Sequence, residues 1–578
     1  MDVCDASLQT KTAMIKERFN GKILLYCGLF LWFVLNLLQG IFTEIHEDEA
    51  YYALFGEHLA WGYYDHPPMV GLMAYLSSLL FSGTLGVRFF TVVASCFTLL
   101  ILWRIASSDG DAGGSCLDGS VPRHDAKRLM LFFTLACSVV MFNFYGFVTT
   151  PDVSLLLFSA LFLLVYQRYC VESSWKSALL MGLLMALMVY SKYHAFLLLG
   201  LIVLSNLKLL KDGKFWAACL LASVLLMPHI VWQVQADFPS LRYHLSGRSE
   251  PFRWSYFLEY LPNQLLVFNP FTLGAMVFVI ASEAKQSRAT SPNERFERGL
   301  RFIFVGFFLF FWLMSFRGHV EPHWTAIGTI SVVVLIYRKA LVDTKLMKYV
   351  KRVIAPSLLV VMAVRIALLT PVAARFGFCQ DRQHYEAIAS EAGSRPVLFR
   401  SSFQQPALYH YFTGKESTTL CSYYDRKTQY DLWQFDTTWI GKPMVYVDKT
   451  GLTEHFQTAN RLVTEFQIVN ENEKQPIVLC TNDTILIDFS IYNPCPQPID
   501  FQKGMALKLL LLDGNMVRYG SYAPIEILRP HTTYHGQFSV VLGQETPLGN
   551  NHLLLGIGDP IAIFADAKNA VKVVIEAP

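Results

Sequence analysis

The sequence predicts an α-helical multi-pass membrane protein with extracytoplasmic domains at its C-terminus. Of the 578 residues, 53% are hydrophobic and only 16% are charged, whereas an ordinary soluble domain carries about 25% charged residues. Apolar runs of roughly the 20 residues needed to cross a bilayer recur as far as Pro371. The net charge of +3 is too small to indicate a nucleic-acid-binding protein.

About eleven apolar runs are long enough, or nearly so, to cross a membrane. They begin near Ile23, Gly86, Leu129, Val153, Ser177, Ala195, Phe215, Tyr256, Phe302, Trp324 and Val353. Lys and Arg gather before the first run and in every second loop, which is typical of cytoplasmic segments. We therefore expect an inner-membrane protein with a cytoplasmic N-terminus and, given an odd number of spans, a periplasmic C-terminus.

The first external loop is strongly acidic, because it contains no Lys or Arg from Phe42 to Met69. Asp48 can open a helix, since an Asp near a helix N-terminus accepts backbone N–H bonds. The helix that follows would place Tyr52 on an apolar face and Glu49 on the opposite, polar face. We expect this helix to lie along the membrane interface, with the loop's tyrosines at headgroup depth. A simpler interpretation makes Asp48 a helix cap.

Basic residues also occur in external segments, where they are not expected. Lys192 interrupts a long apolar run, which predicts two short helices with the lysine at the break. It can either extend to lipid headgroups or bind a lipid-linked phosphate. Arg242 and Arg248 lie in another external loop, and the planar guanidinium suits phosphate oxygens. For Arg248, pairing with Glu250 or with headgroups is an equally open interpretation.

Several external segments, taken in order, resemble the GT-C glycosyltransferases of the protein-O-mannosyltransferase and ArnT-like superfamily. The segments are Asp48-Glu49-Ala50-Tyr51-Tyr52, Gly62-Tyr63-Tyr64-Asp65-His66-Pro67-Pro68, Thr150-Pro151-Asp152, Ser191-Lys192-Tyr193-His194, Phe238 to Arg248 and Glu321-Pro322-His323-Trp324. The resemblance implies inverting transfer of a sugar from a polyprenyl-phosphate carrier to an envelope acceptor, which is a lipid, a glycan or a protein. It also implies a GT-C fold for the membrane region.

The resemblance assigns catalytic roles to the acidic residues. Asp48 matches the family's first-loop Asp, which would take the proton of the attacking hydroxyl or orient the acceptor. Glu49 beside it is a second candidate. Asp152 resembles the family's acidic residue of the second loop and would support the acceptor or a metal. A single base suffices, because the leaving phosphate is already ionised.

The other assigned residues form two groups. The donor phosphate would be bound by Lys192, Arg242, His66 and Arg248, and the substrate or acceptor cavity would contain Tyr52, Tyr64, Asp65, Glu321, His323 and Trp324. For Glu321, His323 and Trp324 the alternative is a role in the core or at the lipid headgroups. For Asp65 and His66 the alternative is a role as turn residues. The family commonly has basic residues where this chain has Tyr51 and His66. The sequence indicates no definite cofactor. A divalent metal remains open through His46, Glu47, Asp65, His66 and His323, although no HExxH spacing is present.

Three domains are expected: residues 1–372 as the transmembrane catalytic domain, 373–470 as an α/β domain, and 471–578 as an Ig-like β-sandwich. Extended apolar stretches and a helix from Thr453 to Glu465 predict the α/β domain. Period-two strands separated by turn residues predict the sandwich. Two other functions are open: a transporter or flippase of a lipid-linked substrate, or a scaffold whose β-domain binds glycans.

Overall fold

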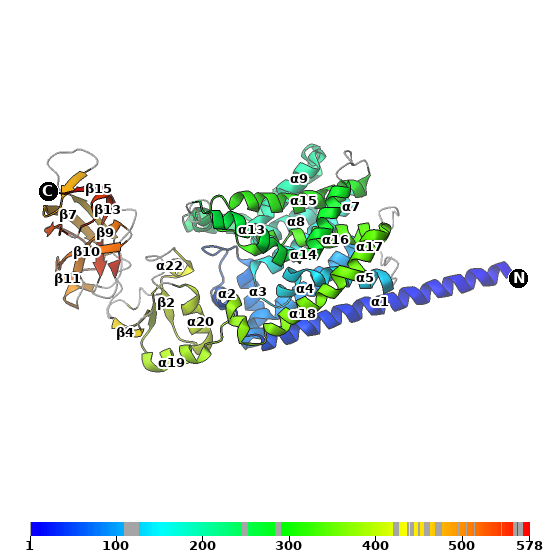
Figure 1. Cartoon of the computed structure of the whole chain (residues 1–578), viewed down its shortest axis with the longest axis horizontal. Helices are drawn as coiled ribbons and strands as arrows, with labels where there is room; N and C mark the ends of the chain where they lie inside the picture. The colour runs from blue at the N-terminus through cyan, green and yellow to red at the C-terminus, as the bar shows by residue number, and fades with distance from the viewer. Residues whose placement is uncertain are drawn as a thin grey trace. The chain divides into compact units, whose positions relative to one another are not determined.

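The computed structural model describes most of the chain. The described residues are 2–108, 126–244, 252–283, 291–400, 402–419, 427–435, 439, 444–448, 451–455, 463–468, 477–493, 498–503, 506–513, 515–544, 546–558, 563–564 and 570–577. They divide into two compact units, Met1–Gln380 and Asp381–Pro578 (Figure 1). The predicted phosphate ligand Arg248 lies outside the described residues.

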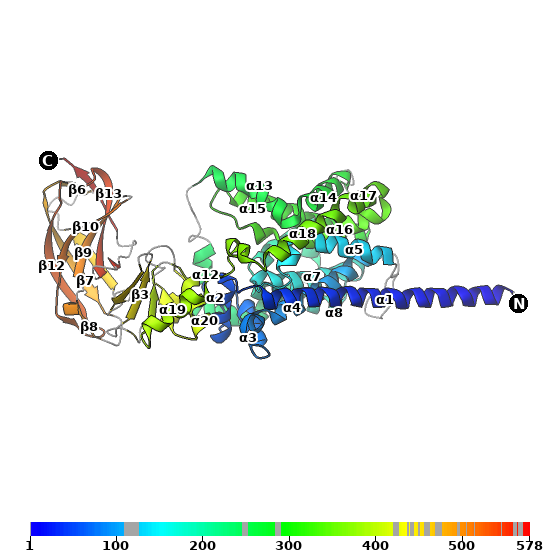
Figure 2. The same cartoon turned by 60° about the horizontal axis from the view of Figure 1, so that its bottom comes forward.

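The first unit is helical. In chain order its elements are α1 (Asp2–Phe42), α2 (Glu47–Glu57), α3 (Met69–Ser78), α4 (Gly83–Ser107), α5 (Ala126–Ser138), α6 (Val140–Phe144), α7 (Pro151–Val171), α8 (Trp175–Ser191), α9 (His194–Ser205), η1 (Leu207–Lys211), α10 (Gly213–Leu225), α11 (Met227–Gln235), α12 (Pro239–Arg242), α13 (Trp254–Phe268), α14 (Pro270–Glu283), α15 (Pro292–Met314), η3 (Pro322–Thr325), α16 (Gly328–Val342), α17 (Thr344–Tyr349), η4 (Val350–Ile354), α18 (Ala355–Ala367) and η5 (Pro371–Phe376). Helix α7 packs against α4, α8 and α15, and one continuous apolar core joins these helices (Figure 2).

Several helices have the length and composition of membrane spans. Among the described residues, α1 over Gly21–Phe42, α4 and α7 meet both criteria, and counting the bent pairs α10–α11 and α13–α14 as spans raises the number to five. The predicted apolar runs all coincide with helices, but α9 has 12 residues and is therefore only about 18 Å long. A bilayer core is roughly 30 Å thick. The multi-pass helical class is thus confirmed, whereas the number of about eleven spans stays a prediction.

The second unit begins with a mixed α/β region. Its elements are α19 (Arg382–Ala392), β1 (Val397–Phe399), α20 (Gln404–Thr413), β2 (Ser417–Thr419), α22 (Gln429–Trp433), β3 (Met444–Asp448) and β4 (Gly451–His455). The sheet order is β2-β1-β3-β4, with β1 parallel to both neighbours. The predicted helix from Thr453 to Glu465 is wrong at its start, because β4 pairs antiparallel with β3 and Thr453 lies opposite Tyr446. Backbone pairing therefore overrides the helical pattern of the side chains.

The rest of the second unit is β-rich. Its strands are β5 (Val463–Ile468), β6 (Ile477–Cys480), β7 (Thr484–Tyr492), β8 (Ile499–Asp500), β9 (Ala506–Asp513), β10 (Asn515–Tyr522), β11 (Ile527–Leu528), β12 (Thr533–Val541), β13 (Gly549–Gly558), β14 (Ile563–Phe564) and β15 (Val571–Glu576), with a short turn of 3₁₀ helix, η8 (Phe501–Lys503). Alternate residues of β7, β9 and β13 share one apolar core, so the sheets β12-β7-β5 and β10-β9-β13-β15-β6 face each other. Strand β5 pairs with β7, although it precedes the expected boundary at 470. The Ig-like topology stays a prediction.

Candidate active site at the start of α2 and α7

Helix α2 begins where its sequence provides a reciprocal cap. The His46 ring accepts a hydrogen bond from the Asp48 backbone N–H at 3.2 Å, and the Glu49 carboxylate accepts one from the His46 N–H at 3.0 Å. Such a pairing satisfies backbone donors that a helix N-terminus leaves without partners. Cys379 N–H donates to the Ile45 carbonyl at 2.8 Å, which fastens this end of the helix to the chain after α18. The cap fixes the direction in which Asp48 and Glu49 point.

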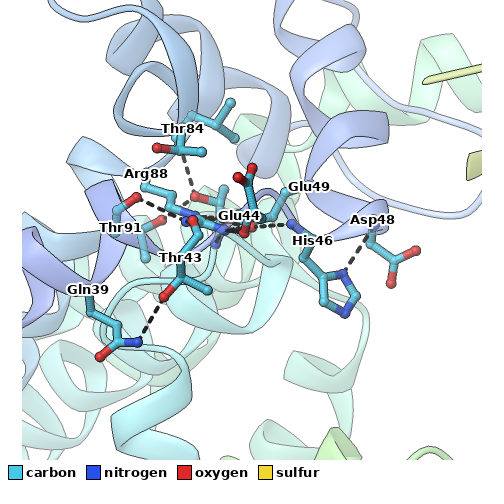
Figure 3. Close-up of polar contacts among 12 residues, drawn as sticks. Gln39, Thr43, Glu44, His46, Asp48, Glu49, Thr84, Arg88 and Thr91 are labelled. Carbon is cyan, nitrogen blue, oxygen red and sulfur yellow. Dashed lines mark hydrogen bonds and ion pairs between the residues drawn. The ribbon is translucent and has the colours of Figure 1, made fainter. Parts of the chain in front are cut away.

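Adjacent acidic residues on α2 point in different directions. Glu49 is fully buried and bound by Arg88 of α4, whose Nε lies 2.9 Å from Oε1. Figure 3 shows the Asp48 carboxylate pointing away from this pair. The expected position of Glu49 on a polar face is therefore wrong, because an ion pair with Arg88 stabilises its burial.

Three tyrosines of the first loop, Tyr51, Tyr52 and Tyr63, are buried inside the protein, and the predicted headgroup depth of the loop stays a prediction. Tyr63 stacks on Phe55 with ring centroids 3.9 Å apart, and its hydroxyl donates to the Phe55 carbonyl at 2.8 Å. Tyr51 and Tyr52 are also buried, and α2 packs closely on α3. Helix α2 is therefore packed within the protein through its aromatic side chains, and its position along the membrane interface stays a prediction.

Asp152 and Lys192 form the second buried ion pair. Asp152 lies in the first turn of α7, directly after Pro151, which fits the first helical turn because it has no N–H to satisfy. Lys192 ends α8 and precedes α9, so the predicted break in the apolar run is present. Lys192 Nζ lies 2.7 Å from Asp152 Oδ2, and His323 Nε2 lies 3.8 Å from the same oxygen. Segments far apart in the chain therefore converge on Asp152.

The environment of Tyr52 links the acidic residues of the first loop to Asp152 of α7. Burial, followed by the charges of Asp48, Asp65 and Asp152, raises the pKa of Tyr52 well above its ordinary value. Its hydroxyl lies 3.2 Å from His66 Nε2. The charges of three carboxylates thus act on a buried tyrosine whose hydroxyl contacts a histidine, and such perturbed groups are typical of functional sites.

The remaining predicted residues lie around this centre in different ways. The Tyr64 ring packs on Tyr243 at 5.5 Å, and Trp324 packs on His194 at 5.6 Å. Glu321 precedes η3 and lies 3.9 Å from His319. Arg242 binds Asp237, with Nη2 2.6 Å from Oδ1 in a largely exposed pair. Exposed pairs contribute about 0–1 kcal/mol, so Arg242 can leave Asp237 at little cost, and its role in phosphate binding stays a prediction.

Metal binding receives no structural support within the described part of the chain. There, no three His, Cys, Asp or Glu side chains are grouped so that they would hold a metal ion. The histidines and carboxylates near Asp152 instead pair with one another or with tyrosine and lysine. A divalent metal at this site stays a prediction.

Sequence reasoning missed Arg88, Thr149, His194 and His244 as members of the site. Arg88 had a signal, because a charged residue inside an apolar run is expected to have a partner or a function. Thr149 donates its backbone N–H to Glu49 at 2.8 Å, a contact that no side-chain pattern predicts. His244 Nε2 lies 3.3 Å from the Asp65 carbonyl, and only the fold brings these two loops together.

Comparisons with known proteins agree with this architecture. Residues 125–232 match the family model described as dolichyl-phosphate-mannose-protein mannosyltransferase. The structure of ArnT from Cupriavidus metallidurans in the apo state is similar with a TM-score of 0.50 at 13% identity, over 73% of this chain and 91% of that one. The same protein bound to undecaprenyl phosphate gives a TM-score of 0.51 at 13% identity, over 73% and 92% of the two chains. No curated protein matches the sequence significantly.

The helical unit therefore defines a multi-pass membrane protein with the GT-C fold. The likeness to ArnT shows this fold, and the family match over residues 125–232 agrees with the resemblance that the order of the external motifs predicted.

Proposed function

We propose that this chain is an inverting glycosyltransferase that uses a polyprenyl-phosphate-linked sugar. The acceptor is an envelope lipid, glycan or protein, and the reaction occurs at the periplasmic face of the inner membrane. The observation that carries the proposal is the convergence of Asp48, Asp65 and Asp152 around Tyr52, with Lys192 bound to Asp152 at 2.7 Å. One of the similar ArnT structures holds undecaprenyl phosphate, which supports a donor of this class.

The reaction requires one base and a site for one anion. The acceptor hydroxyl oxygen forms a bond to the anomeric carbon, and its proton passes to the Asp48 carboxylate. The bond between that carbon and the phosphate oxygen breaks, and the bonding electrons leave with the phosphate. Attack from the face opposite the phosphate inverts the anomeric configuration.

Lys192 and Asp152 would act on the leaving phosphate. An ammonium group has three N–H donors, and Asp152 Oδ2 is the one hydrogen-bond acceptor that the described residues offer to Lys192 Nζ. The remaining donors are available to a phosphate oxygen, where a fixed cation stabilises the charge that develops in the transition state. Asp152 holds the lysine in position, and Glu49 holds α2 through Arg88.

An in vitro transfer assay tests the proposal. Purified wild-type protein would be mixed with a panel of polyprenyl-phosphate sugars and envelope lipids, and product would be detected by mass spectrometry. We expect Asp48→Asn to lower turnover by about 10²–10⁴-fold, as the loss of a general base does. If the wild type transfers sugar from no member of the panel, the proposed function is wrong. If Asp48→Asn keeps full turnover, Asp48 is not the general base.

Glu57→Gln is the matched control for Asp48→Asn. Both substitutions replace a carboxylate by an amide on α2, but Glu57 is exposed in the last turn of the helix. We expect this variant to transfer sugar at the wild-type rate. A loss equal to that of Asp48→Asn would mean that the negative charge of α2, and not the base, limits the reaction.

A further inference from the structure

Four histidines from four separate segments lie near one another at the start of α9, which directly follows Lys192 and Tyr193. His194 begins α9, and Lys192, His244, His323 and His66 all lie within its electrostatic range. We call His66, His194, His244 and His323 the histidine cluster. Two of these residues, His194 and His244, have no role in the function proposed above.

His194 is the most enclosed member of the cluster. Its ring meets Phe311 edge-on at 5.0 Å and Trp324 at 5.6 Å. Its Nδ1 atom is buried and has no hydrogen-bond partner among the described residues. A buried polar atom without a partner is costly, so this nitrogen marks a place where a ligand atom would be stabilised.

The other groups that face the cluster come from several elements. His66 contacts Tyr52 of α2, His244 contacts the Asp65 carbonyl and the Tyr193 ring, and His323 faces Asp152. Lys192 stands beside His194 with its charge offset by Asp152, and the Arg242 charge is offset by Asp237. Two fixed cations that the sequence assigned to phosphate therefore already carry a carboxylate partner.

We propose that the histidine cluster binds the phosphate of the lipid-linked donor and takes up a fraction of a proton on average when it does so. This inference rests on the proposed function and adds a regulation to it: donor affinity rises as the pH falls. In the empty site, a protonated imidazole beside Lys192 meets a like charge. A bound phosphate supplies the opposite charge, so the protonated form becomes favourable only with the donor in place.

The size of the effect follows from proton linkage. Imidazole has an ordinary pKa of about 6.5, so its charge changes within the physiological range. One proton taken up on binding makes the affinity about tenfold higher per pH unit. Partial uptake by several members of the cluster gives about three- to tenfold between pH 8 and pH 6.

Binding of undecaprenyl phosphate to the full-length protein in lipid nanodiscs tests the inference. Affinity would be measured at about pH 8 and about pH 6 for wild type, His244→Gln and the double variant His194→Gln/His244→Gln. The phosphate of undecaprenyl phosphate also titrates in this range. Its titration affects all variants equally, so it cancels when the affinity of each variant is divided by that of wild type at the same pH. We expect the affinity of wild type relative to that of each variant to be about three- to tenfold higher at the lower pH than at the higher pH. Inorganic phosphate, run in parallel, separates recognition of the lipid from recognition of phosphate alone.

His319→Gln is the matched control. His319 lies in the same external loop as His323, but it faces Tyr256 and Glu321 and is not among the groups around His194. This variant should keep the wild-type pH response. His244→Gln alone, at an exposed position, keeps the test valid if the double variant does not fold.

The outcomes separate the inference from the proposed function. Equal pH responses of wild type and His244→Gln, or no binding by wild type at either pH, would overturn the cluster as the phosphate site. If the wild type still transfers sugar in the panel assay, the proposed glycosyltransferase function is retained and only the histidine cluster as phosphate site is rejected. Proton uptake measured by calorimetry in buffers of different ionisation enthalpy should be larger for wild type than for the double variant.

Discussion

Two buried carboxylate–cation pairs lie near each other in this fold, and they are built differently. In the pair Glu49–Arg88 neither side chain is exposed, and the Arg88 guanidinium also donates to the carbonyls of Gly40, Thr43 and Glu44. In the pair Asp152–Lys192 the side chains are 3% and 9% exposed. The first pair is fully enclosed by protein, whereas the second adjoins the histidine cluster.

The difference between the two pairs indicates a structural role for Glu49–Arg88 and a chemical role for Asp152–Lys192. Glu49 accepts hydrogen bonds from Arg88, from the backbone of Thr149 and from the backbone of His46. It therefore ties α2 to α4 and to the turn that leads to Asp152. A carboxylate with so many donors has no capacity left for a substrate. Lys192 keeps donors available, so the second pair is the one that can meet a ligand.

The largest expected effect is the loss of the enclosed pair. Arg88→Met would leave the Glu49 charge buried without its cation, and breaking such a pair costs about 3–5 kcal/mol. We expect low yield and a strongly decreased melting temperature, measured by thermal unfolding of the purified protein in detergent. Glu49→Gln should do nearly the same, because it leaves the Arg88 charge without a partner.

The result for Glu49→Gln also decides the role of Glu49. A variant with the melting temperature of wild type but without sugar transfer would make Glu49 a catalytic residue, as the sequence comparison with the family suggested. Glu57→Gln provides the baseline, since it changes the same functional group at an exposed position of α2.

Much of the fold was predictable from periodicity. The apolar runs located the helices, Lys192 marked the break between α8 and α9, and alternating residues located strands such as β7 and β9. The burial of the first loop was not predictable, because its tyrosines have the composition of a membrane interface. They are buried because α3 and the loop around Tyr63 pack against α2, which is a tertiary contact.

The candidate site was predictable only in its acidic part. Asp48, Asp65 and Asp152 were identified from charge at an external face and from the family pattern. Whether Asp48 or Glu49 points inward depends on the cap at His46 and on Arg88, which lies 39 positions further along the chain. The partners of Lys192 and the gathering of four histidines likewise depend on contacts between distant loops.

A smaller effect on stability, but a large one on turnover, is expected at the second pair. Asp152→Asn and Lys192→Ala should each lower sugar transfer by about 10²–10³-fold, the size of loss seen when one transition-state donor is removed. The double variant should lose much less than the product of the two, because the residues act as one unit. Transfer rates and melting temperatures measured together check this, and fully multiplicative losses would contradict a shared role.

The smallest effect concerns Glu47, the half-buried neighbour of Asp48. Burial, followed by the charge of Asp48, raises the pKa of Glu47 above its ordinary value, although His46 opposes the shift. The folded protein therefore holds this proton to a higher pH than the unfolded chain does. Between the two pKa values the folded state binds more protons, so the free energy of unfolding decreases as the pH rises through that window.

Glu47→Gln removes this pH-dependent decrease in the free energy of unfolding, and so measures the cost of a charged Glu47 at the start of α2. Below the pKa of the unfolded chain, wild-type Glu47 is protonated in both states, and the variant gains nothing from the missing charge. Above the raised pKa of the folded state, the variant should be the more stable protein. The difference in melting temperature between variant and wild type should therefore grow from acid to neutral pH and then level off. A constant difference across this range would mean that neither burial nor the charge of Asp48 raises the pKa of Glu47 in the folded protein.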